Sequence, residues 1–167
     1  MNEFIEIGCN QKVDLNRYRV RYFNGQDGSE YKLIVIHEKV CVPENEFVVI
    51  PVSGTQNGPD GIALYNAEDE PIDYLAYEGT FTTKTGLIME HISGFESGST
   101  PSSFSLQKIG EGCQGDDFVW KETAAASSRG RVNDGQTLKC GVAPSIWINE
   151  FHYVRTVGTN HTFYLRK

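Results

Sequence analysis

The side chains that could carry chemistry are spread widely along this 167-residue chain. Two histidines stand beside a glutamate, in the pairs His37-Glu38 and Glu90-His91, and such a pair could act as a general acid and base or bind a metal. A histidine next to a glutamate is more often ordinary polar surface. No serine, cysteine or threonine lies in a nucleophile-elbow motif. The sequence therefore predicts a protein that is not an enzyme.

Four aspartates near expected turns could supply the oxygen ligands that calcium prefers, namely Asp60, Asp69, Asp73 and Asp134. None of them has the regular spacing of an EF-hand loop. Asp-Gly and Asn-Asp-Gly are also favourable turn sequences, which explains Asp60 and Asp134 without a metal. We therefore expect no cofactor and no bound metal, with calcium as the alternative.

Composition indicates one globular domain, because 39% of the residues are hydrophobic and 22% are charged. The net charge of −7 argues against nonspecific nucleic-acid binding, which needs clustered basic residues. Arg17, Arg19 and Arg21 alternate, which is typical of the solvent face of a strand. No apolar run is long enough to span a membrane. No signal-peptide pattern follows Met1, so we expect either a cytosolic protein or a natural start elsewhere.

Most of the chain is expected to form short strands joined by tight turns. Apolar or alternating runs predict strands at residues 4–7, 18–23, 32–36, 47–52, 61–65, 72–77, 105–109, 118–120, 136–138 and 146–153. Residues 93–103 are rich in Gly, Ser and Thr and indicate a surface loop, whereas residues 122–127 are a helix candidate too short to be stable alone. This pattern favours an all-β antiparallel sandwich.

The two ends of the chain raise one question about strand pairing. Residues 146–153, IWINEFHY, resemble the opening strand of a β-domain, and residues 4–7 resemble a strand that needs a partner. An apolar sheet edge left bare invites another strand. We therefore expect the C-terminal strand to complete a sheet through four apolar side chains, Ile146, Ile148, Phe151 and Tyr153.

Several sequence blocks occur in the order of a known domain family. They are NGPDGIAL at 57–64, DYLAYEGTFT at 73–82, SLQ at 105–107 and VNDGQT at 132–137. These blocks resemble the lamin-tail domain family, in the form found in extracellular proteins, and the resemblance covers nearly the whole chain. It implies an immunoglobulin-like β-sandwich over residues 1–140, followed by a linker and a terminal strand over residues 141–167.

The block that normally comes first in that family stands last here. Family members usually begin with a strand like INEFHY at 148–153 and continue with one like EFIEI at 3–7, while VGTN at 157–160 and FYL at 163–165 resemble the continuation. The tail could fold back into its own sheet, the chain could be cut from a tandem array, or the strand could be donated to a neighbour to build a filament. Because domain termini often lie close together, self-closure is the simplest arrangement.

Four cysteines are compatible with two disulfides in three possible pairings, and no pair has the short spacing of a structural zinc site. In an up-and-down meander the ends of the first and third strands point the same way, which brings Cys9 near Cys41. Cys113 and Cys140 would lie at adjoining ends of consecutive strands. We therefore predict the disulfides Cys9–Cys41 and Cys113–Cys140 in an oxidising compartment. The alternative is four buried thiols in a cytosolic protein.

Asn160-His161-Thr162 is an N-glycosylation sequon, which makes Asn160 a predicted modification site. Together with the family resemblance, the sequon favours an extracellular structural, adhesion or assembly module. A more specific version of this hypothesis is a module that polymerises by strand donation. The expected partners are further copies or tandem neighbours, and carbohydrate or matrix, with no nucleic acid and no membrane span. The alternative is a substrate-binding accessory domain of a secreted hydrolase or nuclease, with a lectin-like module as a third option.

Overall fold

Strands and turns make up nearly all the regular structure of this computed structural model, which describes residues 3–43, 46–140 and 143–155. Within those residues the helical structure is a single 3₁₀ turn, η1 (Gly115–Asp117). None of the helical structure found there is long and apolar enough to cross a membrane. The prediction of an all-β protein is confirmed.

The larger of the two main sheets has seven strands. Its main path runs in the order β12–β11–β15–β1–β6, and two further strands, β13 and β14, also pair with β11. These strands are β1 (Phe4–Cys9), β6 (Val48–Pro51), β11 (Phe104–Gly112), β12 (Val119–Trp120), β13 (Ala125–Ala126), β14 (Gln136–Leu138) and β15 (Ile146–His152). The β11–β14 pair is parallel, whereas the main path is antiparallel throughout.

The smaller main sheet has four antiparallel strands in the order β4–β3–β7–β8. They are β3 (Arg19–Asn24), β4 (Glu30–Val35), β7 (Asp60–Tyr65) and β8 (Pro71–Tyr77). Two short ribbons complete the fold: β2 (Val13–Asp14) with β5 (Val40–Cys41), and β9 (Phe81–Thr82) with β10 (Ile88–Met89).

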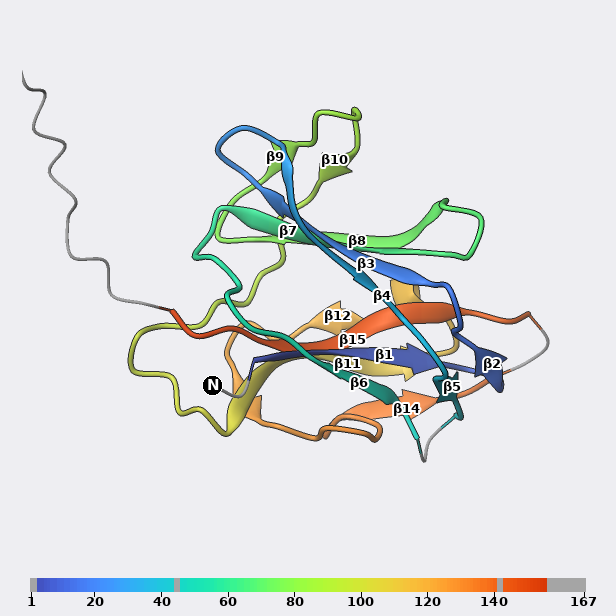
Figure 1. The fold of residues 1–167 in the computed structure, drawn as a ribbon. Coiled ribbons are helices and arrows are strands. Elements are labelled where there is room, and N and C mark those ends of the chain that lie inside the picture. Colours follow the sequence, from blue (N-terminus) through green and yellow to red (C-terminus); the bar gives the residue numbers. More distant parts are fainter. Residues whose placement is uncertain (1–2, 44–45, 141–142, 156–167) are drawn as a thin grey trace, which may run out of the picture.

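The two main sheets lie face to face and enclose the main hydrophobic core (Figure 1). Because side chains alternate along a strand, β1 sends Ile5 and Ile7 to one face, where both are fully buried. From the smaller sheet, Ile62, Leu64 and Leu75 join the same cluster. Antiparallel strands packed in two layers around one core make a β-sandwich, as expected.

The helix expected over residues 122–127 is wrong. Ala125 and Ala126 form β13, which pairs with the start of β11, Ser105 lying opposite Ala125. A run of three alanines favours a helix, but a helix this short is unstable, and the open edge of β11 offers backbone hydrogen bonds instead. Residues 93–103 form the expected surface loop, which carries a single isolated bridge between Phe95 and Thr123.

The alternating arginines before and on β3 form ion pairs in the smaller sheet. Arg21 Nη2 lies 2.6 Å from Asp69 Oδ1, and Arg19 Nη1 lies 3.6 Å from the same oxygen. Arg17 is exposed and precedes β3. Two of the three side chains are thus neutralised by an aspartate of the β7–β8 turn, in keeping with a polar strand face.

Candidate functional site

The C-terminal strand β15 lies in the middle of the larger sheet of its own chain (Figure 1). On one side it pairs with β1, so that Phe4 lies opposite His152. On the other side it pairs with β11, where Leu106 lies opposite Phe151. In this structure β15 therefore closes the sheet of the molecule to which it belongs.

The side chains expected to complete the sheet also hold the two sheets together. Ile148, Phe151 and Tyr153 are fully buried, and Ile146 is half-buried. Tyr77 on β8 packs against them, with its ring centroid 4.7 Å from Tyr153 and 5.7 Å from Phe151. Since complete burial of one large apolar side chain contributes about 1.5–3 kcal/mol, β15 is a major source of contact between the layers.

Cys9 and Cys41 form a disulfide, as predicted. Cys9 is the last residue of β1, and Cys41 lies on β5, which pairs with the β2 strand that follows β1 along the chain. Both residues are fully buried. The bond is compatible with an oxidising compartment.

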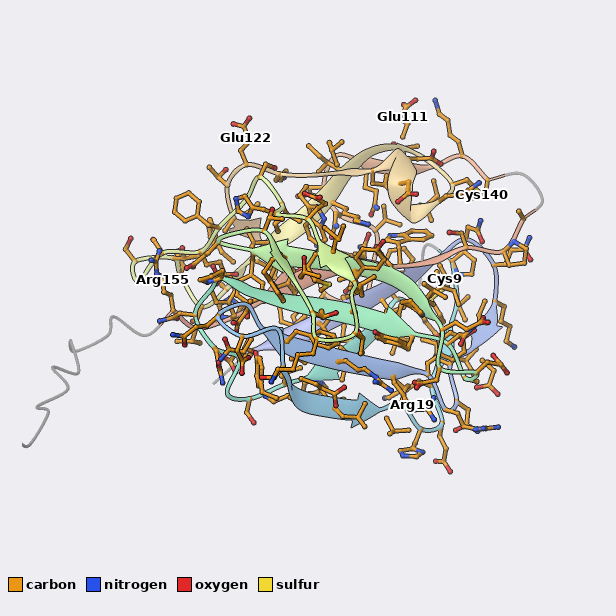
Figure 2. All side chains as sticks on the ribbon, turned by 90° about the horizontal axis from the view of Figure 1, so that it is seen from above. Cys9, Arg19, Glu111, Glu122, Cys140 and Arg155 are labelled. Atoms are coloured by element: carbon orange, nitrogen blue, oxygen red, sulfur yellow. A yellow bond between two sulfur atoms is a disulfide. The ribbon has the colours of Figure 1, made fainter. Side chains whose placement is uncertain are left out.

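The second predicted pair lies at adjoining ends of two parallel strands. On β11 and β14, Gly112 lies opposite Leu138, and Cys113 and Cys140 follow shortly after these two residues. Figure 2 shows Cys140 at the same end of the sandwich as Cys9. The disulfide Cys113–Cys140 stays a prediction, with both residues now placed at neighbouring strand ends.

The predicted glycosylation site, Asn160, lies outside the described residues. The same is true of the blocks at 157–160 and 163–165, and of residues 141–142 in the expected linker. These three interpretations stay predictions from the sequence.

The four aspartates considered as calcium ligands each have a different setting. Asp60 accepts a hydrogen bond from a backbone amide (3.1 Å), and burial raises its pKa to about 6. Asp69 pairs with an arginine of β3, Asp73 pairs with a lysine of β11, and Asp134 lies in a turn. In the ranges that the structure covers, no three His, Cys, Asp or Glu side chains gather into a metal-binding group.

His152 makes a buried contact that the sequence did not indicate. Its Nδ1 lies 2.8 Å from Glu96 Oε2, and burial raises the pKa of that carboxyl while His152 opposes the rise. The Glu96 amide donates to the Tyr153 hydroxyl (3.1 Å), which donates in turn to Glu78 Oε1 (2.7 Å). These contacts tie the 93–103 loop to the end of β15.

An open groove of about 390 Å³ lies between the two main sheets on one flank of the sandwich. It is bordered by β8 of the smaller sheet and by η1 and β12 beside the larger one. Its apolar wall contains Tyr74 and Val119, which are 41% and 63% exposed, together with the partly buried Trp120. Exposed aromatic and apolar side chains in a concave surface are typical of a ligand-binding site.

A buried ion pair lines this groove from the inside. Lys108 Nζ lies 3.3 Å from Asp73 Oδ2 and donates to the Gly115 carbonyl oxygen (3.1 Å). The Ile148 amide donates to the same Asp73 oxygen (2.7 Å). Burial raises the pKa of Asp73, and the nearby ammonium opposes the rise. These contacts connect β8, β11, β15 and η1, and thereby fix the walls of the groove.

The rim of the groove is polar and largely acidic. Glu90, His91 and Asp116 are exposed there, so the Glu90-His91 pair lies on a surface rather than in a metal cluster. Ser93 Oγ donates to the Trp120 carbonyl oxygen (2.9 Å), which anchors β12 beside the rim. The groove thus offers hydrogen-bond donors and acceptors above an aromatic wall.

The other face of the larger sheet carries a buried carboxylate that sequence reasoning missed. Glu150 is fully buried and accepts hydrogen bonds from three serine hydroxyls, those of Ser105 (2.6 Å), Ser127 (2.5 Å) and Ser128 (2.8 Å). The segment after β13 covers it, a contact that strand alternation alone does not predict.

A second buried carboxylate lies beside the first. Glu6 on β1 lies directly opposite Glu150 on β15 and is fully buried as well. It accepts hydrogen bonds from Asn149 Nδ2 (3.0 Å) and from the Gly130 amide. Burial raises the pKa of Glu6 to about 8, and the charge of Glu150 adds to the rise. Together the two carboxylates fasten residues 127–130 onto the sheet.

Comparison of the chain with protein-family profiles, with curated proteins and with solved structures finds no match. The resemblance to lamin-tail domains therefore stays a prediction, based on the sequence blocks alone.

Proposed function

We propose that this protein is a non-enzymatic extracellular adhesion module that binds a carbohydrate chain in the groove between its two sheets. The observation that carries the proposal is the wall of this groove, where Tyr74 and Trp120 lie near the exposed carboxylates of Glu90 and Asp116. The groove is open rather than enclosed, which suits a polymer better than a small metabolite.

The chemistry of the groove matches that of a sugar ring. A pyranose presents an apolar C–H face, which packs on an aromatic side chain, and a rim of hydroxyl groups, which bond to carboxylates and imidazole. Tyr74 and Trp120 supply the aromatic faces, while Glu90, His91 and Asp116 supply the polar partners. The buried Lys108–Asp73 pair supports these residues from within and holds the binding surface in shape.

Two features support an extracellular place for the module. The Cys9–Cys41 disulfide is compatible with secretion, and the Asn160 sequon suits a glycoprotein. The antiparallel pairing of β15 with β1 also agrees with a circularly permuted lamin-tail-like, immunoglobulin-like sandwich, in which these would be consecutive strands.

The position of β15 bears on the mode of assembly. Donating this strand to a neighbour would require its removal from between β1 and β11, where its aromatic side chains pack against the other sheet. We therefore infer that the module acts as a compact protomer and attaches through its surface. Filament formation by strand exchange is the competing model, and molar mass in solution separates the two.

Affinity electrophoresis through gels containing soluble neutral polysaccharides tests the proposed function. We expect a glucan, mannan or xylan to retard the wild-type chain, and Tyr74→Ala and Trp120→Phe to reduce the retardation. Phe95→Ala is the matched control, because Phe95 is 54% exposed but lies outside the groove. Equal mobility in all gels, or equal retardation of both groove variants and wild type, would contradict the proposal.

A further inference from the structure

A second hollow, of about 410 Å³, lies near the start of β1 and shares no residue with the groove. Phe4 lies at its inner side, and two segments form its walls: Ser102 and Ser103 before β11, and residues 127–131 after β13. The Ser127 amide donates to the Ser103 carbonyl oxygen (2.9 Å), which holds the two walls together. The hollow is therefore built by segments that are fixed to each other.

Two arginines of this hollow pair with no carboxylate of the described residues, and the Arg129 charge acts on the buried Glu6 carboxyl only at longer range. Within the described ranges, Arg129 and Arg131 form no ion pair, whereas Arg21 and Arg155 each lie close to a carboxylate. Unpaired arginines side by side are notable in a chain with a net charge of −7. Their field would attract an anion to this point of an otherwise acidic surface.

Arg129 is held in place by an aromatic contact. Its guanidinium carbon lies 4.1 Å from the centroid of the Phe4 ring, and Phe4 is itself buried. A cation–π contact of this kind fixes the plane of the guanidinium and leaves its N–H groups along the edge available for hydrogen bonds. Arg129 is thus positioned before any ligand binds.

The serines of the hollow divide into two groups. The hydroxyls of Ser127 and Ser128 donate hydrogen bonds to the buried Glu150, and they stabilise its carboxylate on the inner side of the hollow. Ser102 and Ser103 are exposed, and their hydroxyls have no partner in the part of the chain that the structure describes. Two guanidinium groups and two available hydroxyls therefore face one hollow.

We propose that this hollow is an anion site for a sulfate or phosphate ester group. A tetrahedral oxyanion presents oxygens in several directions, and can bond to guanidinium groups on one side and to hydroxyls on the other. A neutral sugar would leave both arginine charges without a counterion. The volume of about 410 Å³ exceeds that of the anion alone, so the group is expected to be carried on an organic residue of about sugar size.

Calorimetric titration at constant ionic strength tests the proposal, with glucose 6-sulfate, glucose 6-phosphate and glucose as probes. We expect at least one ester to bind saturably and glucose to bind more weakly. The double substitution Arg129→Gln/Arg131→Gln should weaken ester binding by at least about ten-fold. A preference for one ester tells whether sulfate or phosphate is the natural group.

The matched control is Lys12→Gln/Lys39→Gln. It also removes two positive charges, but beside β2 and β5 at the far end of the sandwich (Figure 1). This control should leave the dissociation constant unchanged. Ser102→Ala/Ser103→Ala tests the exposed hydroxyls without touching Phe4 and should also weaken binding. Ester binding no tighter than glucose binding, or equal affinity in the arginine double variant and the lysine control, would overturn the proposal.

Discussion

Glu6 and Glu150 lie directly opposite each other on β1 and β15, and both side chains are fully buried. Two like charges this close in a buried site favour protonation of one partner. Burial raises the pKa of Glu6 to about 8, and the charge of Glu150 adds to the rise. We infer that Glu6 is mainly protonated at neutral pH.

This proton makes stability depend on pH. The folded pKa of Glu6, about 8, lies above its ordinary value of 4.5, so the folded state binds the proton more tightly than the unfolded state. The stabilisation that comes from this tighter binding of the proton is fully present below pH 4.5, and it is lost as the pH rises toward 8. We therefore expect the midpoint of urea unfolding to fall across this range.

Glu6→Gln should make that dependence shallower, because it removes the titrating group. The glutamine side chain would also place its amide N–H₂ group opposite either Asn149 Nδ2 or the Gly130 N–H, which are themselves donors. The free energy of unfolding at low pH should therefore be lower than in wild type. Glu122→Gln, at an exposed position, is the control and should keep the wild-type slope. If Glu6→Gln and wild type follow parallel curves from pH 4.5 to 8, Glu6 does not hold the proton.

Removal of β15 should unfold the chain rather than expose a stable edge. Deletion of residues 145–167 would leave both β1 and β11 without their central neighbour and would uncover the Tyr77 ring. We expect loss of the cooperative thermal transition and aggregation, with recovery when a peptide of residues 145–155 is added in trans. A deleted chain that stays a folded monomer by light scattering would contradict the role assigned to β15.

A single substitution tests the same contact without deletion. Phe151→Ala should lower the free energy of unfolding by about 3–5 kcal/mol, since it opens a cavity between the sheets beside Tyr77 and Leu106. Val154→Ala, at a position 36% exposed, should change it by less than about 0.5 kcal/mol. Urea titration of both variants, at several protein concentrations, separates loss of packing from a change in assembly.

The Cys9–Cys41 disulfide should contribute measurably to stability. It closes a loop of 32 residues, for which the chain-entropy relation gives about 3–4 kcal/mol. Cys9→Ala/Cys41→Ala should lower the free energy of unfolding by about that amount. Peptide mapping by mass spectrometry without reduction should find the Cys9–Cys41 link and tests the predicted Cys113–Cys140 link in the same digest. A digest in which all four cysteines can be alkylated would contradict both pairings.

The features that could be predicted from the sequence are those that depend on local patterns. Alternating apolar runs in the sequence correctly predicted the positions of most of the long strands, and the Cys9–Cys41 pairing was also predicted correctly. The reasoning behind that pairing was only partly right, because it assumed an up-and-down meander. In the structure Cys41 lies on β5, a short strand paired with β2, and the strand that follows β1 in the larger sheet is β6.

The features that were missed depend on contacts between distant segments. The Glu96–His152 pair joins residues that are 56 positions apart, and no spacing rule connects a loop glutamate to a terminal strand. The burial of Glu150 was also missed, because alternation gives the side of the strand to which a side chain points but not what covers that side. The short strand β13 was mistaken for a helix, since the free edge of β11 outweighs the helix propensity of three alanines.

The buried Lys108–Asp73 pair gives a further test of how the sheets are joined. Lys108→Met removes the ammonium and leaves Asp73 buried without its counterion, which should cost about 3–5 kcal/mol. Loss of Lys108 also removes the effect that holds down the pKa of Asp73. The folded pKa of Asp73 should then rise further, and stability should fall more steeply as the pH increases above the ordinary value of 3.8.

The double variant Lys108→Met/Asp73→Asn keeps an acceptor for the Ile148 amide and buries no charge, so it should recover most of the lost stability. A double-mutant cycle in urea measures this coupling. Additive effects of the two substitutions would mean that the pair does not join the sheets, and the groove walls would then need another source of rigidity.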